Sequence, residues 1–182
     1  GRVAAHPAAD PCPPDAPGAG VAPQPAAATH EPQTRKTMQH AIQHATGEAV
    51  ELLRGLIARP SPSRSEEATA DLLFDFLAAR GAAPERLHNN VWARAEGFDP
   101  TRPTLLLNSH HDTVRPAAGY TRDPHAPDIE GDLLYGLGSN DAGASVVCLT
   151  ETFLAWRQRQ LPFNLVLALS AEEECMGEHG MR

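Results

Sequence analysis

The sequence predicts an α/β fold in which helices alternate with the strands of a mixed, largely parallel sheet. Two apolar runs, over residues 104–109 and 163–170, have the length and composition of buried strands. Apolar residues recur at helical spacing over 48–57, 63–81 and 143–158. This alternation is typical of a sheet with helices on both faces, that is, a three-layer sandwich.

The first part of the chain has a different composition. Residues 1–37 contain eight of the 17 prolines and no Leu, Ile, Phe, Trp, Tyr or Met. Such a segment buries too little apolar surface to offset the entropy lost on ordering. We therefore expect a disordered Pro/Ala-rich segment over 1–37 and a folded domain over 38–182, beginning at Met38.

The helix over 48–57 should end before Pro60, because proline lacks the backbone N–H that a helix requires. Ser63-x-x-Glu66 then resembles a capping box that opens the second helix, and Gly81 should end that helix. The remaining elements are expected in chain order: a strand over 90–95, a strand over 104–109, a short strand over 132–135, a helix over 143–158 and a strand over 163–170.

Composition and charge exclude several classes of protein. The net charge of −8 argues against nucleic-acid binding through a basic surface. No apolar run approaches the roughly 20 residues of a membrane span, and no signal peptide is visible at the start. The cysteines (Cys12, Cys148 and Cys175) are odd in number and form no CxxC motif, which favours a reducing, cytoplasmic location.

His110 and Asp112 follow the apolar strand directly. Residues i and i+2 of an extended segment point to the same side, so both side chains should meet at the end of the strand. A carboxylate behind an imidazole fixes its tautomer, as a metal-ligating histidine needs. The simpler alternatives are a hydrogen-bonded histidine and a turn-forming aspartate. His111 should point to the opposite face, and we expect it not to be a ligand.

Two further acidic stretches follow apolar or Gly-rich segments. Asp141 lies on the Gly-rich loop that opens the helix over 143–158, and Glu172-Glu173-Glu174 ends the strand over 163–170. Adjacent carboxylates are costly to desolvate without a compensating cation, so the set indicates a hydrolytic metal site. The alternatives are a helix N-cap for Asp141 and a solvated turn for the three glutamates.

These motifs resemble, in order and spacing, the signature of the zinc aminoacylase and carboxypeptidase family. The resemblance rests on His110-x-Asp112, on the Gly-Ser-Asn sequence before Asp141 and on Glu173-Glu174, and it extends from about Glu48 to the last residue. The residues that flank the motifs are most similar to those of acetylornithine deacetylases. The resemblance implies a zinc-exopeptidase-like sandwich that is truncated here, without the family's lid and dimerisation domain.

The resemblance also implies a role for each motif residue. His110 would bind a first metal ion, Asp141 would bridge two ions and Glu174 would bind the second. Glu173 would be the general base, and Asp112 would orient His110. The cofactor would be two Zn²⁺ ions, with Co²⁺ as a possible substitute, and each ion would need one more ligand from beyond Arg182. In relatives the peptide bond after the bridging aspartate is often cis.

The implied reaction is hydrolysis of the amide bond of a small N-acyl amino acid, with N-acetylornithine, a substrate of arginine biosynthesis, as the first candidate. Dipeptidase, carboxypeptidase and succinyl-diaminopimelate desuccinylase activities are alternatives, and so is a non-catalytic truncated scaffold. We expect the complete gene product to be active, with homodimerisation through the missing domain. The 182 residues alone should be inactive.

Overall fold

A computed structural model of the chain describes residues 31–181, with side chains from His44 onward. Its elements are, in order, α1 (Glu31–Ile57), α2 (Glu67–Ala79), β1 (Glu85–Leu87), β2 (Asn90–Arg94), β3 (Thr104–His110), β4 (Ile129–Glu130), β5 (Leu133–Leu134), the π-helical turn η1 (Ser139–Gly143), α3 (Ala144–Trp156) and β6 (Asn164–Ser170). Residues 1–30 lie outside the described range, and α1 begins at Glu31, before the boundary predicted at Met38.

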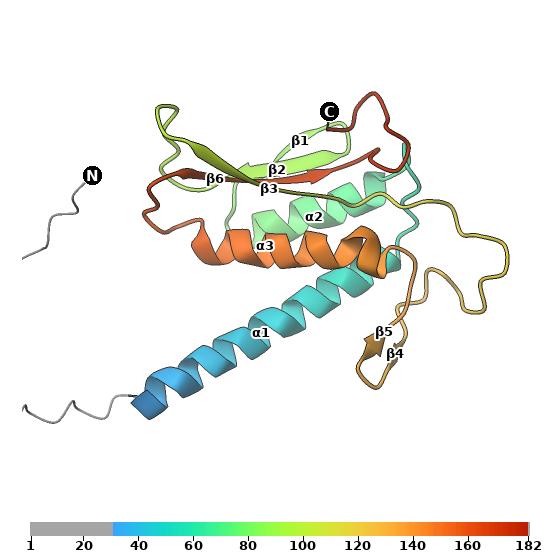
Figure 1. The fold of residues 1–182 in the computed structure, drawn as a ribbon, viewed down its shortest axis with the longest axis horizontal. Helices are drawn as coiled ribbons and strands as arrows, with labels where there is room; N and C mark the ends of the chain where they lie inside the picture. Colours follow the sequence, from blue (N-terminus) through green and yellow to red (C-terminus); the bar gives the residue numbers. More distant parts are fainter. Residues whose placement is uncertain (1–30, 182) are drawn as a thin grey trace, which may run out of the picture.

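The main sheet is mixed, as predicted, with the strand order β1-β2-β6-β3. Strand β6 pairs in parallel with β3, in a register that runs from Thr104 opposite Asn164 to His110 opposite Ser170. Its other neighbour, β2, is antiparallel to it and to β1. Within residues 31–181 the sheet thus has more antiparallel than parallel pairs. The short β4–β5 hairpin stands apart from this sheet (Figure 1).

The helices α1, α2 and α3 all lie on one face of this sheet (Figure 1). The sequence predicted helices on both faces, but residues 31–181 form a single helical layer. A hydrophobic core fills the space between this layer and the sheet. Its fully buried side chains come from α2, α3, β2 and β6 and include Leu73, Leu77, Val91, Val146, Phe153, Leu167 and Leu169.

Strand β3 differs from the buried strand that its apolar run predicted. It is the outermost strand of the described sheet, and Leu105 and Leu106 are 47% and 44% exposed. The central strand is β6, whose residues are buried or half-buried along its whole length. An apolar run has the same sequence pattern in an edge strand and in a central strand, so periodicity could not separate the two.

The predicted capping box is wrong. Glu66 is the N-cap residue of α2, yet its side chain makes no capping hydrogen bond. The Ser63 hydroxyl instead donates to Oδ2 of Asp112 at 2.7 Å. The end of α2 agrees better with the prediction, because Gly81 follows the helix with a positive φ of 71°.

Among residues 31–181, no helix combines the length and apolar character needed to cross a membrane. Cys148 and Cys175 are free and exposed. Cys175 is therefore not part of the hydrophobic core.

Candidate metal centre

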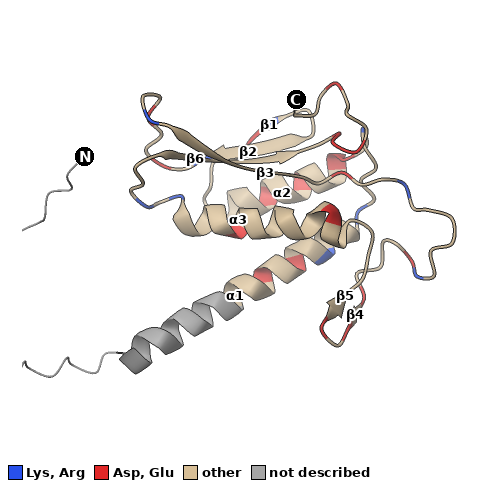
Figure 2. Ribbon diagram, in the orientation of Figure 1, with Lys and Arg blue, Asp and Glu red and all other residues tan. Residues whose placement is uncertain are grey.

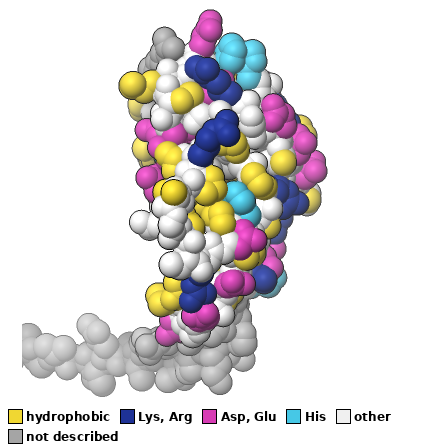
Figure 3. Space-filling view, turned by 90° about the vertical axis from the view of Figure 1, so that its right-hand side faces the viewer, with side chains coloured by type: hydrophobic (Ala, Val, Ile, Leu, Met, Phe, Trp, Pro, Cys, Tyr) yellow, Lys and Arg dark blue, Asp and Glu magenta, His cyan; other side chains and the backbone are white. Residues whose placement is uncertain are grey.

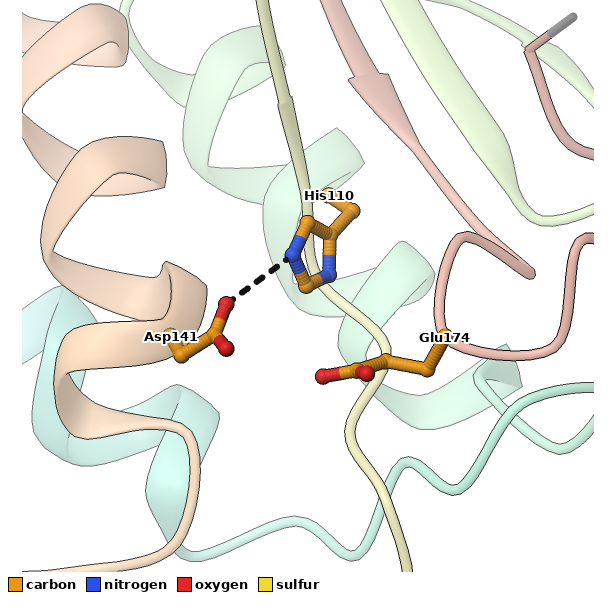
Figure 4. Close-up of side chains that lie close together, drawn as sticks. All are labelled: His110, Asp141 and Glu174. Carbon is orange, nitrogen blue, oxygen red and sulfur yellow. Dashed lines mark ion pairs between the residues drawn. The ribbon is translucent and has the colours of Figure 1, made fainter.

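Three side chains from distant parts of the sequence meet at one end of the sheet (Figure 4). His110 ends β3, Asp141 lies in η1, and Glu174 lies in the segment that follows β6. One ligand atom from each lies within 4.8 Å of the other two. The parallel pairing of β3 with β6 causes this meeting, because it places the carboxyl ends of both strands at the same edge.

The glycines of the loop before α3 allow η1 to approach β3. Gly138 has a φ of 73°, and a Cβ at this position would lie 2.6 Å from Cγ2 of Thr113. The Gly143 N–H donates to the Gly138 carbonyl at 2.8 Å and closes the turn that holds Asp141. The Asp141–Ala142 peptide bond is cis, as the resemblance implied.

Asp141 is not the N-cap of α3, a position that Gly143 occupies. The Asp141 side chain is 80% exposed, and its Oδ1 lies 3.2 Å from Nε2 of His110. The N-cap alternative therefore does not account for an aspartate at this position.

His110 presents its two ring nitrogens to different partners. Nδ1 lies 3.2 Å from the carbonyl oxygen of Asp112 and 3.4 Å from its Oδ1. Nε2 faces Asp141 and lies 3.7 Å from Oε2 of Glu173. The hydrogen bond with the Asp112 carboxylate, supported by the surrounding negative charges, raises the pKa of His110 to about 9. Asp112 therefore directs Nε2 towards the acidic side chains.

Asp112 is completely buried, and both of its carboxylate oxygens accept hydrogen bonds. Oδ1 accepts from the backbone N–H of Glu173 at 3.1 Å, and Oδ2 accepts from that of Glu174 at 3.0 Å and from Ser63. Burial by itself favours the neutral acid, but the hydrogen bonds from His110, Ser63 and the two amides hold its pKa at about 2. The carboxylate is thus ionised and connects β3 to the segment after β6.

The three glutamates after β6 have different surroundings, so a uniformly solvated turn does not describe them. The Glu173 side chain is 60% exposed beside His110. Glu174 is half-buried, and burial together with the nearby charge of Asp141 raises its pKa. Glu172 is buried, and its Oε2 accepts the His179 backbone N–H at 3.2 Å. Glu172 therefore stabilises the segment itself, whereas Glu173 and Glu174 border the centre.

His111 is buried on the opposite side of the strand, as the alternation predicted. Its Nε2–H donates to the Asn89 carbonyl at 2.9 Å, and its Nδ1 lies 2.9 Å from the Thr69 hydroxyl. Burial lowers its pKa. Both nitrogens are thus engaged away from the centre. Outside the centre, His179 stacks on His88 with the ring centroids 4.0 Å apart.

The sequence did not reveal the functions of Ser63 and Glu66, because their spacing fitted a capping box. Glu66 is fully buried and accepts a hydrogen bond from the Glu172 backbone N–H at 3.2 Å. Glu66 and Glu67 are adjacent glutamates, of which the first is buried and the second exposed. Nothing in the sequence distinguishes the two.

Acidic residues from several elements lie near the centre. Figure 2 shows acidic residues in η1, near the start of α2 and in the segment after β6. Viewed from this end, the molecule carries histidine, acidic and basic side chains interspersed with hydrophobic ones (Figure 3). The carboxylates of Asp141, Glu174 and the neighbouring Glu173 would attract a cation to the centre.

Comparisons with known proteins agree with this geometry. Residues 106–182 match the sequence model of Peptidase family M20/M25/M40. The chain is 33% identical over 146 residues to a succinyl-diaminopimelate desuccinylase of Xanthomonas campestris, a match that covers 75% of this chain and 38% of that protein. A desuccinylase of Delftia acidovorans is 32% identical over 139 residues, covering 69% and 36% of the two chains. The chain thus spans less than half the length of these relatives.

Two solved structures share the fold. Human carnosine dipeptidase 1 superposes with a TM-score of 0.58 at 23% identity, covering 80% of this chain and 36% of that one. The Bacillus subtilis YXEP protein is described as a dinuclear metal binding peptidase from the M20 family. It also superposes with a TM-score of 0.58, at 18% identity, covering 76% of this chain and 38% of that one. The described chain therefore has the α/β fold of the M20 peptidases, and residues 106–182 carry the sequence pattern of peptidase family M20/M25/M40.

Proposed function

We propose that the complete gene product containing this chain is a metal-dependent hydrolase of the M20 type that cleaves the amide bond of an N-acyl amino acid. The observation that carries this proposal is the convergence of His110, Asp141 and Glu174, with one donor atom of each within 4.8 Å of the others. The similarity of residues 106–182 to the M20/M25/M40 family supports the same conclusion.

The three donors suit a divalent transition metal. An imidazole nitrogen and carboxylate oxygens are common zinc ligands, and the mutual repulsion of Asp141 and Glu174 would be relieved by a cation between them. We assign His110 to a first ion, Glu174 to a second and Asp141 to both. When bound, such a pair of ions would polarise the acyl carbonyl and lower the pKa of a water molecule.

Glu173 is the proposed general base. Its carboxylate is exposed and lies beside His110, so it can reach a water molecule in the centre without binding metal itself. It would take a proton from the attacking water and return it to the leaving amine. The carbon–oxygen bond forms as the water gives up its proton, and the amide carbon–nitrogen bond breaks as the nitrogen receives that proton, which yields a carboxylic acid and a free amine. Asp112 would keep Nε2 of His110 directed into the centre.

Two substrates are the first to test. The amino-acid sequence of the motifs favours N-acetylornithine as the substrate. The relatives reported above are succinyl-diaminopimelate desuccinylases, which favours N-succinyl-diaminopimelate. Both are N-acyl amino acids with an amide as the scissile bond. They differ in the acyl group, acetyl or succinyl, and in the amino acid, ornithine or diaminopimelate. A dipeptide substrate remains a third candidate, because the chain has the fold of human carnosine dipeptidase 1.

The test is amine release from these substrates by the zinc-loaded complete gene product, beside Glu173→Gln and Glu178→Gln. Glu178 is an exposed acid in the same segment and does not border the centre, so it is the matched control. We expect release by the wild type and the control, and a loss of at least about 10²-fold in kcat for Glu173→Gln with metal content unchanged. Bound metal without hydrolysis of any substrate would favour a non-catalytic scaffold.

A further inference from the structure

Three consecutive backbone N–H groups in the segment after β6 donate to buried carboxylates. The amide of Glu172 donates to Oε1 of Glu66 at 3.2 Å. The next two amides, of Glu173 and Glu174, donate to Oδ1 and Oδ2 of Asp112 at 3.1 and 3.0 Å. The backbone that carries the proposed base is therefore held by two acids from different elements of the fold.

The Glu66 side chain directs all of its described hydrogen bonds away from its own helix, although the Glu66 carbonyl accepts from Thr69 and Ala70 within α2. Oε1 also accepts the Arg64 backbone N–H at 2.6 Å, and Oε2 accepts Nδ2 of Asn89 at 2.9 Å. The residue is 0% exposed and occupies the N-cap of α2, yet it forms no side-chain capping bond. Helix capping therefore does not explain why a carboxylate is buried at this position.

The backbone at Glu172 needs such a constraint. Its φ of 58° lies in the left-handed region, which is unfavourable for a residue with a side chain. The Gly177 N–H donates to its carbonyl at 2.9 Å and the His179 N–H to its Oε2 at 3.2 Å, but both belong to the same segment. Among the described hydrogen bonds of Glu172, the one that its backbone N–H donates to Glu66 is the contact that ties it to another element.

We propose that Glu66 is a positioning residue for the reaction: by fixing the backbone of Glu172, it sets the direction in which the next side chain, Glu173, enters the centre. This inference rests on the proposed function, because it takes Glu173 as the base. A misplacement of about 1 Å at a reacting group can lower a rate on the order of 10²-fold. The effect should fall on kcat, because Glu66 is fully buried and a substrate cannot contact it.

Glu66→Gln is the first test, since it keeps the shape of the side chain but replaces one acceptor with a donor. If the new amide keeps its oxygen towards Arg64 and Glu172, its NH₂ group faces the donor Nδ2 of Asn89. Glu67→Gln is the matched control, because Glu67 is the adjacent exposed acid. When Asn89→Asp is combined with Glu66→Gln, the hydrogen bond can form again in the opposite direction. The new amide at position 66 then donates to the new carboxylate at position 89.

Two measurements on the complete, zinc-loaded protein test whether Glu66 positions Glu173. Hydrogen exchange of the peptide that covers residues 171–176 should rise by about tenfold in Glu66→Gln and stay unchanged in Glu67→Gln. The kcat for amine release should fall by about 10-fold or more with KM unchanged, and the double variant should recover most of both losses. A purely structural role would not give a kcat loss that the exchanged pair restores.

Other outcomes distinguish a failure of the inference about Glu66 from a failure of the proposed function. Unchanged exchange in Glu66→Gln would overturn the inference while leaving the hydrolase intact. A wild-type protein that is inactive towards every N-acyl amino acid would remove the proposed function, and with it the role of Glu66 in positioning a base. If Glu66→Gln does not fold, Asn89→Ala removes the bond to Oε2, together with the exposed bond that Arg86 donates to Oδ1 of Asn89, and should still raise the exchange of residues 171–176. Normal exchange in that variant would contradict the inference.

Discussion

The hydroxyl of Ser63 donates a hydrogen bond to the buried carboxylate of Asp112 across 49 positions of sequence. This bond ties the segment before α2 to the end of β3, next to the three metal-ligand candidates. It also completes the set of donors that keeps Asp112 ionised although its side chain is fully buried. The stability of the centre thus depends on residues that do not border it.

Ser63→Ala should destabilise the protein by about 1 kcal/mol, because Oδ2 of Asp112 loses a donor and keeps only the Glu174 amide. Ser65→Ala is the control, since Ser65 is exposed two residues further on. Chemical unfolding of both variants measures the difference. Equal stabilities would show that water replaces the Ser63 hydroxyl without cost.

The metal-free protein should show a raised pKa for His110. The value of about 9, against an ordinary 6.5, means that protonated His110 stabilises the folded state below pH 6.5. This contribution should be lost as the pH rises from 6.5 through about 9. NMR titration of the imidazole in EDTA measures the pKa. In Asp112→Asn the pKa should return towards 6.5, and an unchanged value would exclude Asp112 as the main cause.

Gly138→Ala should be more damaging than Gly131→Ala. Both glycines have a positive φ, 73° and 59°, but a Cβ at Gly138 lies 2.6 Å from Cγ2 of Thr113 whereas one at Gly131 meets nothing within 4 Å. The left-handed conformation alone costs roughly 1–2 kcal/mol, which Gly131→Ala isolates. Thermal unfolding should show an additional loss for Gly138→Ala. Thr113→Ser removes Cγ2 and should recover part of it, and no recovery would place the strain elsewhere.

The 182-residue chain by itself should bind at most one Zn²⁺ ion, and weakly. The donor group found within residues 31–181 has three members, and catalytic zinc sites commonly use about three protein ligands for each ion. Isothermal titration calorimetry measures the stoichiometry. His110→Ala should abolish the binding, and His125→Ala should leave it unchanged. Tight binding of two ions would contradict the prediction.

The sequence was most informative where a polar residue ends an apolar run. His110 and Glu174 each follow such a run, and the parallel pairing of β3 with β6 then brings them together. Asp141 could also have been an N-cap, and only the structure shows that its carboxylate faces His110. The metal and catalytic roles of these residues remain predictions.

The sequence was least informative where two structures share one pattern. Ser63 and Glu66 have the spacing of a capping box, but their side chains bond to Asp112 and to the Glu172 amide, which are remote in sequence. Similarly, the apolar run of β3 did not distinguish an edge strand from a central one. Local patterns contain no information about which distant partner will compete for a side chain.

The pairing of β3 with β6 joins residues 60 positions apart, as in Thr104 opposite Asn164. Bringing β3 and β6 together closes a long loop, and this lowers the chain entropy before the strand contacts form. The helices α1, α2 and α3 form from local contacts alone. During synthesis, His110 and Asp141 emerge from the ribosome before β6 and Glu174 do. The nascent chain therefore carries two of the three donors without the third, and the ability to capture a cation should arise late in folding, when β6 joins β3.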